Sequence, residues 1–193
     1  MPPLTPGEQT LMRTRKECGI NALRILQEVT PVRSTNYIFD FTSSTEDRTL
    51  VQLRRGIDRR AMSRSLTVTM ASRLGNCDEK AKLCLAGLIG NPRITVPNGH
   101  HCTLCRGLNY DHVFIVVTDL PIPANTQLAN LGRTAMVLDG WTEDWYFPNL
   151  PAENNGWFDE FTHLPNLRQA WVRSNTRAAN IGPYPMVNFN VGV

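Results

Sequence analysis

The sequence predicts an α+β fold in which a helix that begins with a cysteine packs on an antiparallel sheet, next to a helical N-terminal layer. Three observations carry this prediction. Apolar residues follow a helical spacing after Cys77, two later segments are rich in β-branched and apolar residues, and residues 7–28 have a helical apolar face. Helices and strands that are grouped in this way favour an α+β arrangement.

The N-terminal part, residues 1–65, is expected to be mostly helical. In residues 7–28, apolar side chains fall roughly on one face, and Pro31 ends the helix. The segment 37–41 is a candidate short strand, and a second helix is expected to start near Ser44 or Thr45, where a capping residue precedes an acidic first turn.

The remaining residues, 66–193, are predicted to form a catalytic core within a single domain of 193 residues. Asn76 is a good N-cap for a helix that starts at Cys77, and Gly90-Asn91-Pro92 ends that helix. Residues 91–110 are expected to be a loop. Strands are predicted at 112–118, 134–141 and, from an alternating pattern, near 187–193.

Composition and charge exclude several classes of protein. The chain is 41% hydrophobic and 19% charged, which is typical of a globular protein, and its net charge of +3 is too small to predict nucleic-acid binding. No apolar run is long enough for a membrane span, and the N-terminus lacks the apolar segment of a Sec-type signal peptide. The odd number of cysteines, five, favours reduced thiols in a cytosol-like compartment.

Three residues in three different elements suggest chemistry. Cys77 opens a helix, His112 opens a strand and Asp139 lies near the end of the next strand. If the two strands pair antiparallel, His112 and Asp139 become neighbours, and Val137, Asp139 and Trp141 share a face by the period of two. The sequence therefore predicts a Cys-His-Asp triad.

The residue types suit nucleophilic catalysis on an acyl carbon. A helix N-terminus and a neighbouring imidazolium both stabilise a thiolate, which is a strong nucleophile. His112 would hold the thiolate as an ion pair and protonate the leaving amine, while Asp139 would fix the imidazole tautomer. Backbone N–H groups in the first helical turn, beside Asn76 and Asp78, would hold the oxyanion.

Three motifs, "GNCDEKA", "DHVFIVV" and "VLDGW", resemble those of the papain-like and transglutaminase-like superfamily. The resemblance is closest to the AvrPphE (HopX, XopE) type III effectors of bacteria and extends weakly to toxin glutamine deamidases. It spans residues 72–145 and carries over to Cys77, His112 and Asp139, with Trp141 following the aspartate. Asp78 departs from the family pattern, which has glycine there, and this change places a carboxylate beside the nucleophile.

The resemblance implies a papain/transglutaminase-like core without cofactor or metal. It implies a bacterial effector that is secreted without a Sec signal and acts in the cytoplasm of a target cell. There it would deamidate or transglutaminate a glutamine of a host protein, with Asn76, Asp78 and Trp141 as oxyanion or substrate-binding residues. A chaperone or an immunity protein is a further partner to consider.

Four alternatives stay open from the sequence. The same triad serves a papain-like protease, and the same fold serves as an inactive protein-binding module. The motif "HHCTLC", residues 100–105, has a Cys-x2-Cys pair that is typical of half a zinc site, although no second ligand pair follows at a usual spacing. His163 is a weaker candidate for the catalytic histidine.

Overall fold

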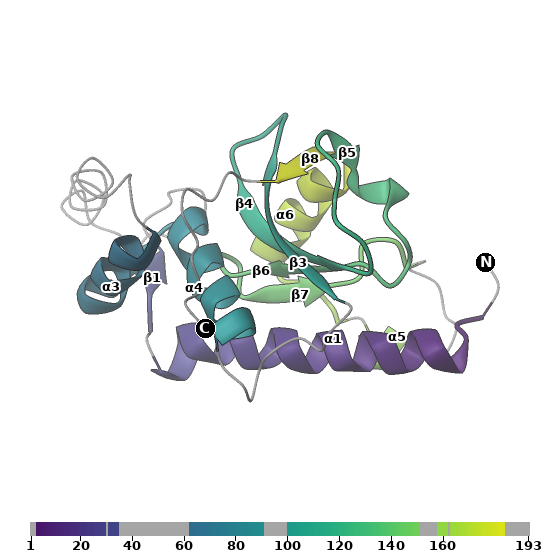
Figure 1. Cartoon of the computed structure of the whole chain (residues 1–193), viewed down its shortest axis with the longest axis horizontal. Coiled ribbons are helices and arrows are strands. Elements are labelled where there is room, and N and C mark those ends of the chain that lie inside the picture. Colours follow the sequence, from purple (N-terminus) through teal and green to yellow (C-terminus); the bar gives the residue numbers. More distant parts are fainter. Residues whose placement is uncertain are drawn as a thin grey trace.

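The computed structural model of the chain describes residues 3–29, 31–34, 62–90, 100–150, 158–161 and 163–183. These residues form an α+β structure with a six-stranded antiparallel sheet, as the sequence predicts. Figure 1 shows the long helix α1 running beneath both the sheet and the helix α4. None of the helices in these residues is both long and apolar enough to cross a lipid bilayer.

Helix α1 (Pro6–Arg24) begins where the sequence supplies a capping box. The Thr5 side chain accepts a hydrogen bond from the backbone N–H of Glu8, and the Glu8 side chain accepts one from the backbone N–H of Thr5. The helix continues as a π-helical turn, η1 (Ile25–Val29). Together they match the helix that the apolar pattern predicts over residues 7–28.

Helix α4 (Cys77–Gly90) has the bounds that the sequence predicts. It follows helix α3 (Met62–Ser72) and the short strand β2 (Leu74–Gly75), which pairs in parallel with β1 (Arg33–Ser34). The tight link between β2 and α4 leaves Cys77 as the first helical residue.

The sheet has the strand order β5-β8-β3-β4-β6-β7, and all its pairs are antiparallel. Its strands are β3 (His101–Gly107), β4 (Val113–Thr118), β5 (Thr126–Gln127), β6 (Met136–Asp139), β7 (Asp144–Tyr146) and β8 (Asn180–Pro183). Strands β4 and β6 pair with Ile115 opposite Leu138. This confirms the antiparallel pairing that the triad prediction required.

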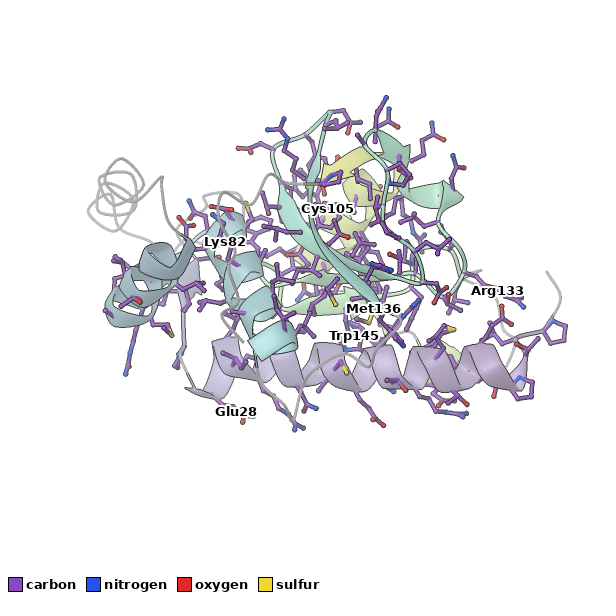
Figure 2. The ribbon with its side chains drawn as sticks, viewed as in Figure 1. Glu28, Lys82, Cys105, Arg133, Met136 and Trp145 are labelled. Carbon is purple, nitrogen blue, oxygen red and sulfur yellow. The ribbon has the colours of Figure 1, made fainter. Side chains whose placement is uncertain are left out.

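Both faces of the sheet are apolar. One face joins α1, η1 and α4 in a core that includes Ile115, Met136 and Leu138. Figure 2 shows Met136 and Trp145 between the sheet and α1, and Cys105 farther from that helix. The other face forms a second cluster with Phe114, Val116 and Val137. A sheet that is covered on both faces explains why all six residues of β4 are buried.

The helix η2 (Leu128–Asn130) and the helices α5 (Phe158–Phe161) and α6 (Leu167–Arg177) complete the described elements. An Asn166–Gln169 capping box fixes the start of α6. The buried side chains of Phe161 and Val172 join α5 and α6 to the core that α1 and α4 share.

Two predictions about the elements are wrong. Residues 91–110 are not all loop, because His101–Gly107 form β3, which lies in the sheet between β8 and β4. Trp141 does not share the face of Val137 and Asp139, because β6 ends at Asp139 and residues 140–143 form a turn. The turn returns Trp141 to the core beside α4.

Other predictions lie outside the described residues. These are the strands at 37–41 and 187–193, and the helix start near Ser44 or Thr45.

Candidate functional site

Cys77 is held at the start of α4 by a network around Asn76. The backbone N–H of Asn76 donates to the Glu79 carboxylate at 2.9 Å, and the backbone carbonyl of Asn76 accepts from the N–H of Lys80 at 3.0 Å. Both contacts are those of an N-cap. A cysteine at this position has its thiol beside the positive end of the helix dipole.

The sheet brings His112 and Asp139 together. His112 Nε2 lies 2.7 Å from Asp139 Oδ2, in the antiparallel arrangement that the sequence predicts. The other carboxylate oxygen, Oδ1, accepts hydrogen bonds from the backbone N–H groups of Trp141 at 2.8 Å and Thr142 at 3.2 Å. The turn after β6 therefore fixes the carboxylate, and the carboxylate fixes the imidazole.

The electrostatics of the pair favour the charged imidazole. Burial alone would lower the pKa of His112, but the charge of Asp139 and its hydrogen bond raise that pKa, and the hydrogen bond and charge of Cys77 raise it further, to about 10. Burial opposes the ionised form of Asp139, but His112 and the two backbone N–H groups lower its pKa below the usual value.

The proximity of Cys77 completes the predicted group of three. The Cys77 side chain lies close enough to the imidazole to raise the pKa of His112. Because Asp139 occupies Nε2, the imidazole has Nδ1 left for Cys77. The structure thus brings together all three residues that the sequence singled out, with His112 between the thiol and the carboxylate.

Aromatic rings enclose the imidazole. The Trp141 ring packs edge-on to His112 with centroids 5.4 Å apart, and the rings of Tyr110 and Phe114 each lie 5.7 Å away. Among the described residues, the buried indole N–H of Trp141 has no hydrogen-bond partner. A buried donor without an acceptor is costly.

Asp78 forms an ion pair in the first turn of α4. Its Oδ2 accepts from Lys82 Nζ at 2.8 Å, one turn along the helix, and this ion pair offsets the carboxylate beside Cys77. Within the described residues, Asp78 Oδ1 is buried and has no hydrogen-bond partner. A buried carboxylate oxygen without a partner is costly.

The site is nearly closed. Cys77 is 7% exposed, His112 3% and Asp139 1%. A group that reaches the thiol must therefore be slender, or the surrounding side chains must move.

The remaining cysteines lie in apolar surroundings. Burial raises the pKa of Cys102 to about 11 and that of Cys105 to about 12, and it also raises the pKa values of Cys18 and Cys84. Cys102 and Cys105 are three residues apart in β3, so their side chains leave opposite faces and pack in different clusters. This geometry does not suit the Cys-x2-Cys zinc alternative, and the described residues hold no group of three or more candidate metal ligands.

His163, the weaker candidate, belongs to a different network. Its Nε2 lies 2.7 Å from Asp144 Oδ1, and Arg173 contacts the same carboxylate through two nitrogens at 2.7 and 2.8 Å. Such a bidentate pair is a common way to satisfy a buried carboxylate.

The thiols are expected to differ in reactivity. Iodoacetamide near neutral pH should modify Cys77 first, because its thiol alone lies at a helix start beside an imidazolium, whereas raised pKa values keep the other four thiols protonated. Peptide mapping by mass spectrometry over time measures each rate. Faster modification of Cys102 or Cys18 than of Cys77 would contradict this assignment.

Gly140 sets the distance between the turn after β6 and α4. A Cβ atom at this position would lie 2.9 Å from the backbone oxygen of Lys80 and 3.1 Å from Leu26 Cδ1. The backbone that carries Asp139 can therefore approach the first turn of α4 only with glycine at 140. This requirement explains the Asp-Gly-Trp order in the sequence.

Gly140→Ala is expected to destabilise the protein by about 1–3 kcal/mol, the usual cost of overpacking a buried contact. Urea unfolding measures the change. Gly7→Ala is the matched control, since a Cβ atom there meets nothing within 4 Å and should leave stability unchanged or slightly higher. If Gly140→Ala and Gly7→Ala have the same free energy of unfolding, the turn after β6 can move away from α4 at little cost in free energy.

Sequence reasoning missed two side chains at the site. The Arg168 guanidinium lies 4.1 Å from the centre of the Trp141 ring, and Lys80 is a buried lysine one turn from Cys77. Arg168 is on α6, distant in sequence from every motif, and no local signal could have placed it. Lys80 had a signal, since it lies three residues after Cys77 and four before Cys84, the spacing of one helical face.

Comparison of the chain with protein-family models, with curated proteins and with solved structures found no match.

Proposed function

We propose that this chain is a cysteine-dependent acyltransferase or hydrolase that acts on a protein amide, with a papain/transglutaminase-like core. The observation that carries the proposal is the placement of His112, which bonds the buried carboxylate of Asp139 and lies near enough to the Cys77 side chain for that residue to raise its pKa. A thiolate, a proton donor and a group that orients the donor are the parts that nucleophilic acyl transfer requires.

In the first half of the reaction, the Cys77 thiolate attacks the carbonyl carbon of an amide and forms a C–S bond. The carbonyl electron pair moves to oxygen, which becomes the oxyanion. When the oxyanion collapses, the C–N bond breaks and the His112 imidazolium gives its proton to the leaving nitrogen. The products are a thioester on Cys77 and a neutral amine, which is ammonia if the amide belongs to a glutamine side chain.

The oxyanion would be held by donors at the start of α4 and by Trp141. The backbone N–H groups of Cys77 and Asp78 lie in the first helical turn, where backbone donors lack helical partners. The buried indole N–H of Trp141, which has no partner among the described residues, would add a third donor. Asn76 positions this turn, and Asp78 Oδ1 would accept from the substrate amide nitrogen.

In the second half, neutral His112 removes a proton from water or an amine, which attacks the thioester carbon. The C–S bond breaks, and the sulfur leaves as thiolate. Water gives a carboxylate, so a glutamine becomes glutamate, whereas an amine gives a new amide, as in transglutamination. A backbone amide as substrate makes the same chemistry proteolysis.

Deamidation or transglutamination of glutamine is our first choice among these reactions. The nearly closed site supports it, because a glutamine side chain is slender and ends in the amide, whereas a peptide bond must bring the chain on both sides to the thiol. The motif resemblance adds the biological setting: a bacterial effector, secreted without a Sec signal, that modifies a protein in the target-cell cytoplasm. A papain-like protease is the alternative within the same mechanism.

An inactive binding module is the second candidate. The low exposure of Cys77 and the ion-paired Asp78 beside it favour this reading, since both restrict access to the thiol. The intact contacts of His112 favour the enzyme.

The experiment that tests the proposal incubates the protein with glutamine-containing peptides and a primary amine and records intact masses. Deamidation adds about 1 Da, transglutamination adds the amine less ammonia, and proteolysis splits the peptide. The matched control is Cys77→Ala under the same conditions. If no peptide forms a thioester on Cys77 and all peptide masses stay unchanged, the binding module is favoured.

A further inference from the structure

An ion pair joins α4 to the turn that holds Asp139. Lys80 Nζ lies 3.3 Å from Glu143 Oε1, and the two side chains are 3% and 36% exposed. Lys80 follows Cys77 by one helical turn, and Glu143 is the last residue of the turn 140–143. The pair therefore links the helix that begins with the candidate nucleophile to the turn whose N–H groups hold the Asp139 carboxylate.

The backbone of Glu143 has a conformation that needs support. Its φ angle is 54°, in the left-handed region that residues with a Cβ atom rarely adopt. Both oxygens of its carboxylate are held, Oε1 by Lys80 and Oε2 by Gln27 Nε2 at 3.1 Å. An unfavourable backbone conformation persists where surrounding contacts determine it, and these two contacts do so at the end of the turn.

Packing contributes little to holding the turn on this side. A cavity of about 440 Å³ is lined by Lys80, Glu143 and Gln27, among other residues. Atoms that line such a space lack van der Waals partners in its direction. The polar contacts of the Glu143 carboxylate therefore do here what close packing does elsewhere in the core.

The other polar contacts of the turn lead to a different helix. Arg168 Nη2 donates to the backbone oxygen of Trp141 at 2.6 Å, and Gln169 Nε2 donates to that of Thr142 at 3.2 Å. Both donors belong to α6, so they tie the turn to α6. The Lys80 side chain supplies the corresponding link to α4, the helix that begins with the thiol.

We propose that Lys80 is a positioning residue, which acts through Glu143 to hold the turn after β6 against the start of α4. By this link the carboxylate of Asp139 keeps its place relative to the thiol of Cys77. The meaning of this inference for catalysis rests on the proposed function. The arrangement itself can be measured without any substrate.

The titration of His112, followed by NMR of its imidazole in wild type and Lys80→Met, tests the inference. Methionine is similar in length, and Glu143 is exposed enough to be hydrated once its partner is lost, so the fold should persist. If the turn then moves, Asp139 leaves the imidazole. The pKa of His112 should fall from its wild-type value of about 10 by about one unit or more, the scale of effect that an adjacent opposite charge has.

The sign of the shift separates positioning from direct electrostatics. Removing the positive charge of Lys80, and with it the partner of Glu143, would by charge alone raise the pKa of His112 or leave it unchanged. A fall therefore identifies a displaced carboxylate. An unchanged or raised pKa in folded Lys80→Met would refute the positioning role.

Two further variants support this test. Lys16→Met makes the same substitution on α1, where Lys16 Nζ donates to the Glu160 backbone oxygen at 2.7 Å, and it should leave the pKa of His112 unchanged. If Lys80→Met does not fold, Gln27→Ala decides, because it releases the other oxygen of Glu143 without a change of charge at an exposed position. The pKa of His112 should again fall, and an unchanged value would refute Glu143 as the link.

The same samples distinguish this inference from the proposed function. Lys80→Met should react with iodoacetamide at Cys77 severalfold more slowly than wild type near neutral pH, because fewer imidazolium groups stabilise the thiolate. Wild type that lacks acyl transfer would contradict the proposed function. The titration of His112 would still decide whether Lys80 positions the carboxylate.

Discussion

Cys77→Ser is expected to abolish acyl-enzyme formation, with a loss on the order of 10⁶-fold, the loss seen when the nucleophile is removed from a comparable triad. Oxygen is close to sulfur in size, but the hydroxyl is far less acidic. The imidazolium that His112 forms beside Asp139 stabilises a thiolate and cannot take a proton from serine. Single-turnover acylation with an activated ester, followed by intact mass, measures the loss.

Cys84→Ser is the matched control for this substitution. Cys84 lies two turns along the same helix, is fully buried and has its thiol 4.0 Å from the backbone oxygen of Ala22. Its replacement should cost stability and leave acylation intact once the folded fraction is taken into account. If Cys77→Ser keeps most activity while Cys102→Ser loses it, the nucleophile has been assigned wrongly.

Local signals in the sequence were sufficient to predict that Cys77, His112 and Asp139 lie together. The start of α4 follows from Asn76, an N-cap, and from the acidic residues after Cys77, and the structure begins the helix there. The apolar, β-branched segments around Ile115 and Leu138 were sufficient for two strands, and their antiparallel pairing places His112 beside Asp139.

Strand β3 shows where this reasoning fails. Its sequence, "HCTLCRG", mixes histidine, threonine and arginine with two cysteines, so it has neither an apolar run nor a clear alternation. The strand is specified by its neighbours: it pairs with β4 along six residues and with β8 on its other side. Tertiary pairing of this kind overrides a weak local preference.

Trp141 and Arg168 show a second limit. The period of two places Trp141 with Val137 only if the strand continues, but the strand ends at Asp139 because its carboxylate accepts from the N–H groups of the following turn. Arg168 stacks on Trp141 from a helix 27 residues later. Nothing in either local segment encodes that contact, so it depends on tertiary packing.

The pH dependence of the free energy of unfolding should also reflect the shifted pKa values of His112 and Asp139. The folded pKa of His112, about 10, lies above the unfolded value of 6.5, so its contribution to stability is complete below pH 6.5 and is lost as the pH rises toward 10. The folded pKa of Asp139 is lowered, so its contribution is present above its unfolded pKa and is lost as the pH falls. Urea unfolding of wild type and Asp139→Asn between pH 6 and 10 isolates the alkaline part.

Asp139→Asn is expected to lower the acylation rate by about 10²–10³-fold, less than the roughly 10⁴-fold loss in a serine triad, because the helix start still stabilises the thiolate. Asparagine keeps the shape of the side chain but removes its negative charge. That charge offsets the burial of the His112 imidazolium, so the pKa of His112 should fall. Asp139→Ala should be slower still, because the N–H groups of Trp141 and Thr142 also lose their acceptor.

The pH profile distinguishes this role from a merely structural one. In wild type, single-turnover acylation by a glutamine amide, whose leaving nitrogen needs a proton, should persist until the pH approaches the pKa of His112, about 10, where that proton is lost. In Asp139→Asn the alkaline limb should move by more than one unit toward lower pH. Burial lowers the pKa of His112, and in this variant no carboxylate charge offsets that effect. The control is Asp119→Asn, which alters a carboxylate paired with Arg15 and should leave the limb in place. A profile in Asp139→Asn that keeps its alkaline limb at the wild-type position would mean that a different group holds the proton on His112, and the positioning role of Asp139 would be refuted.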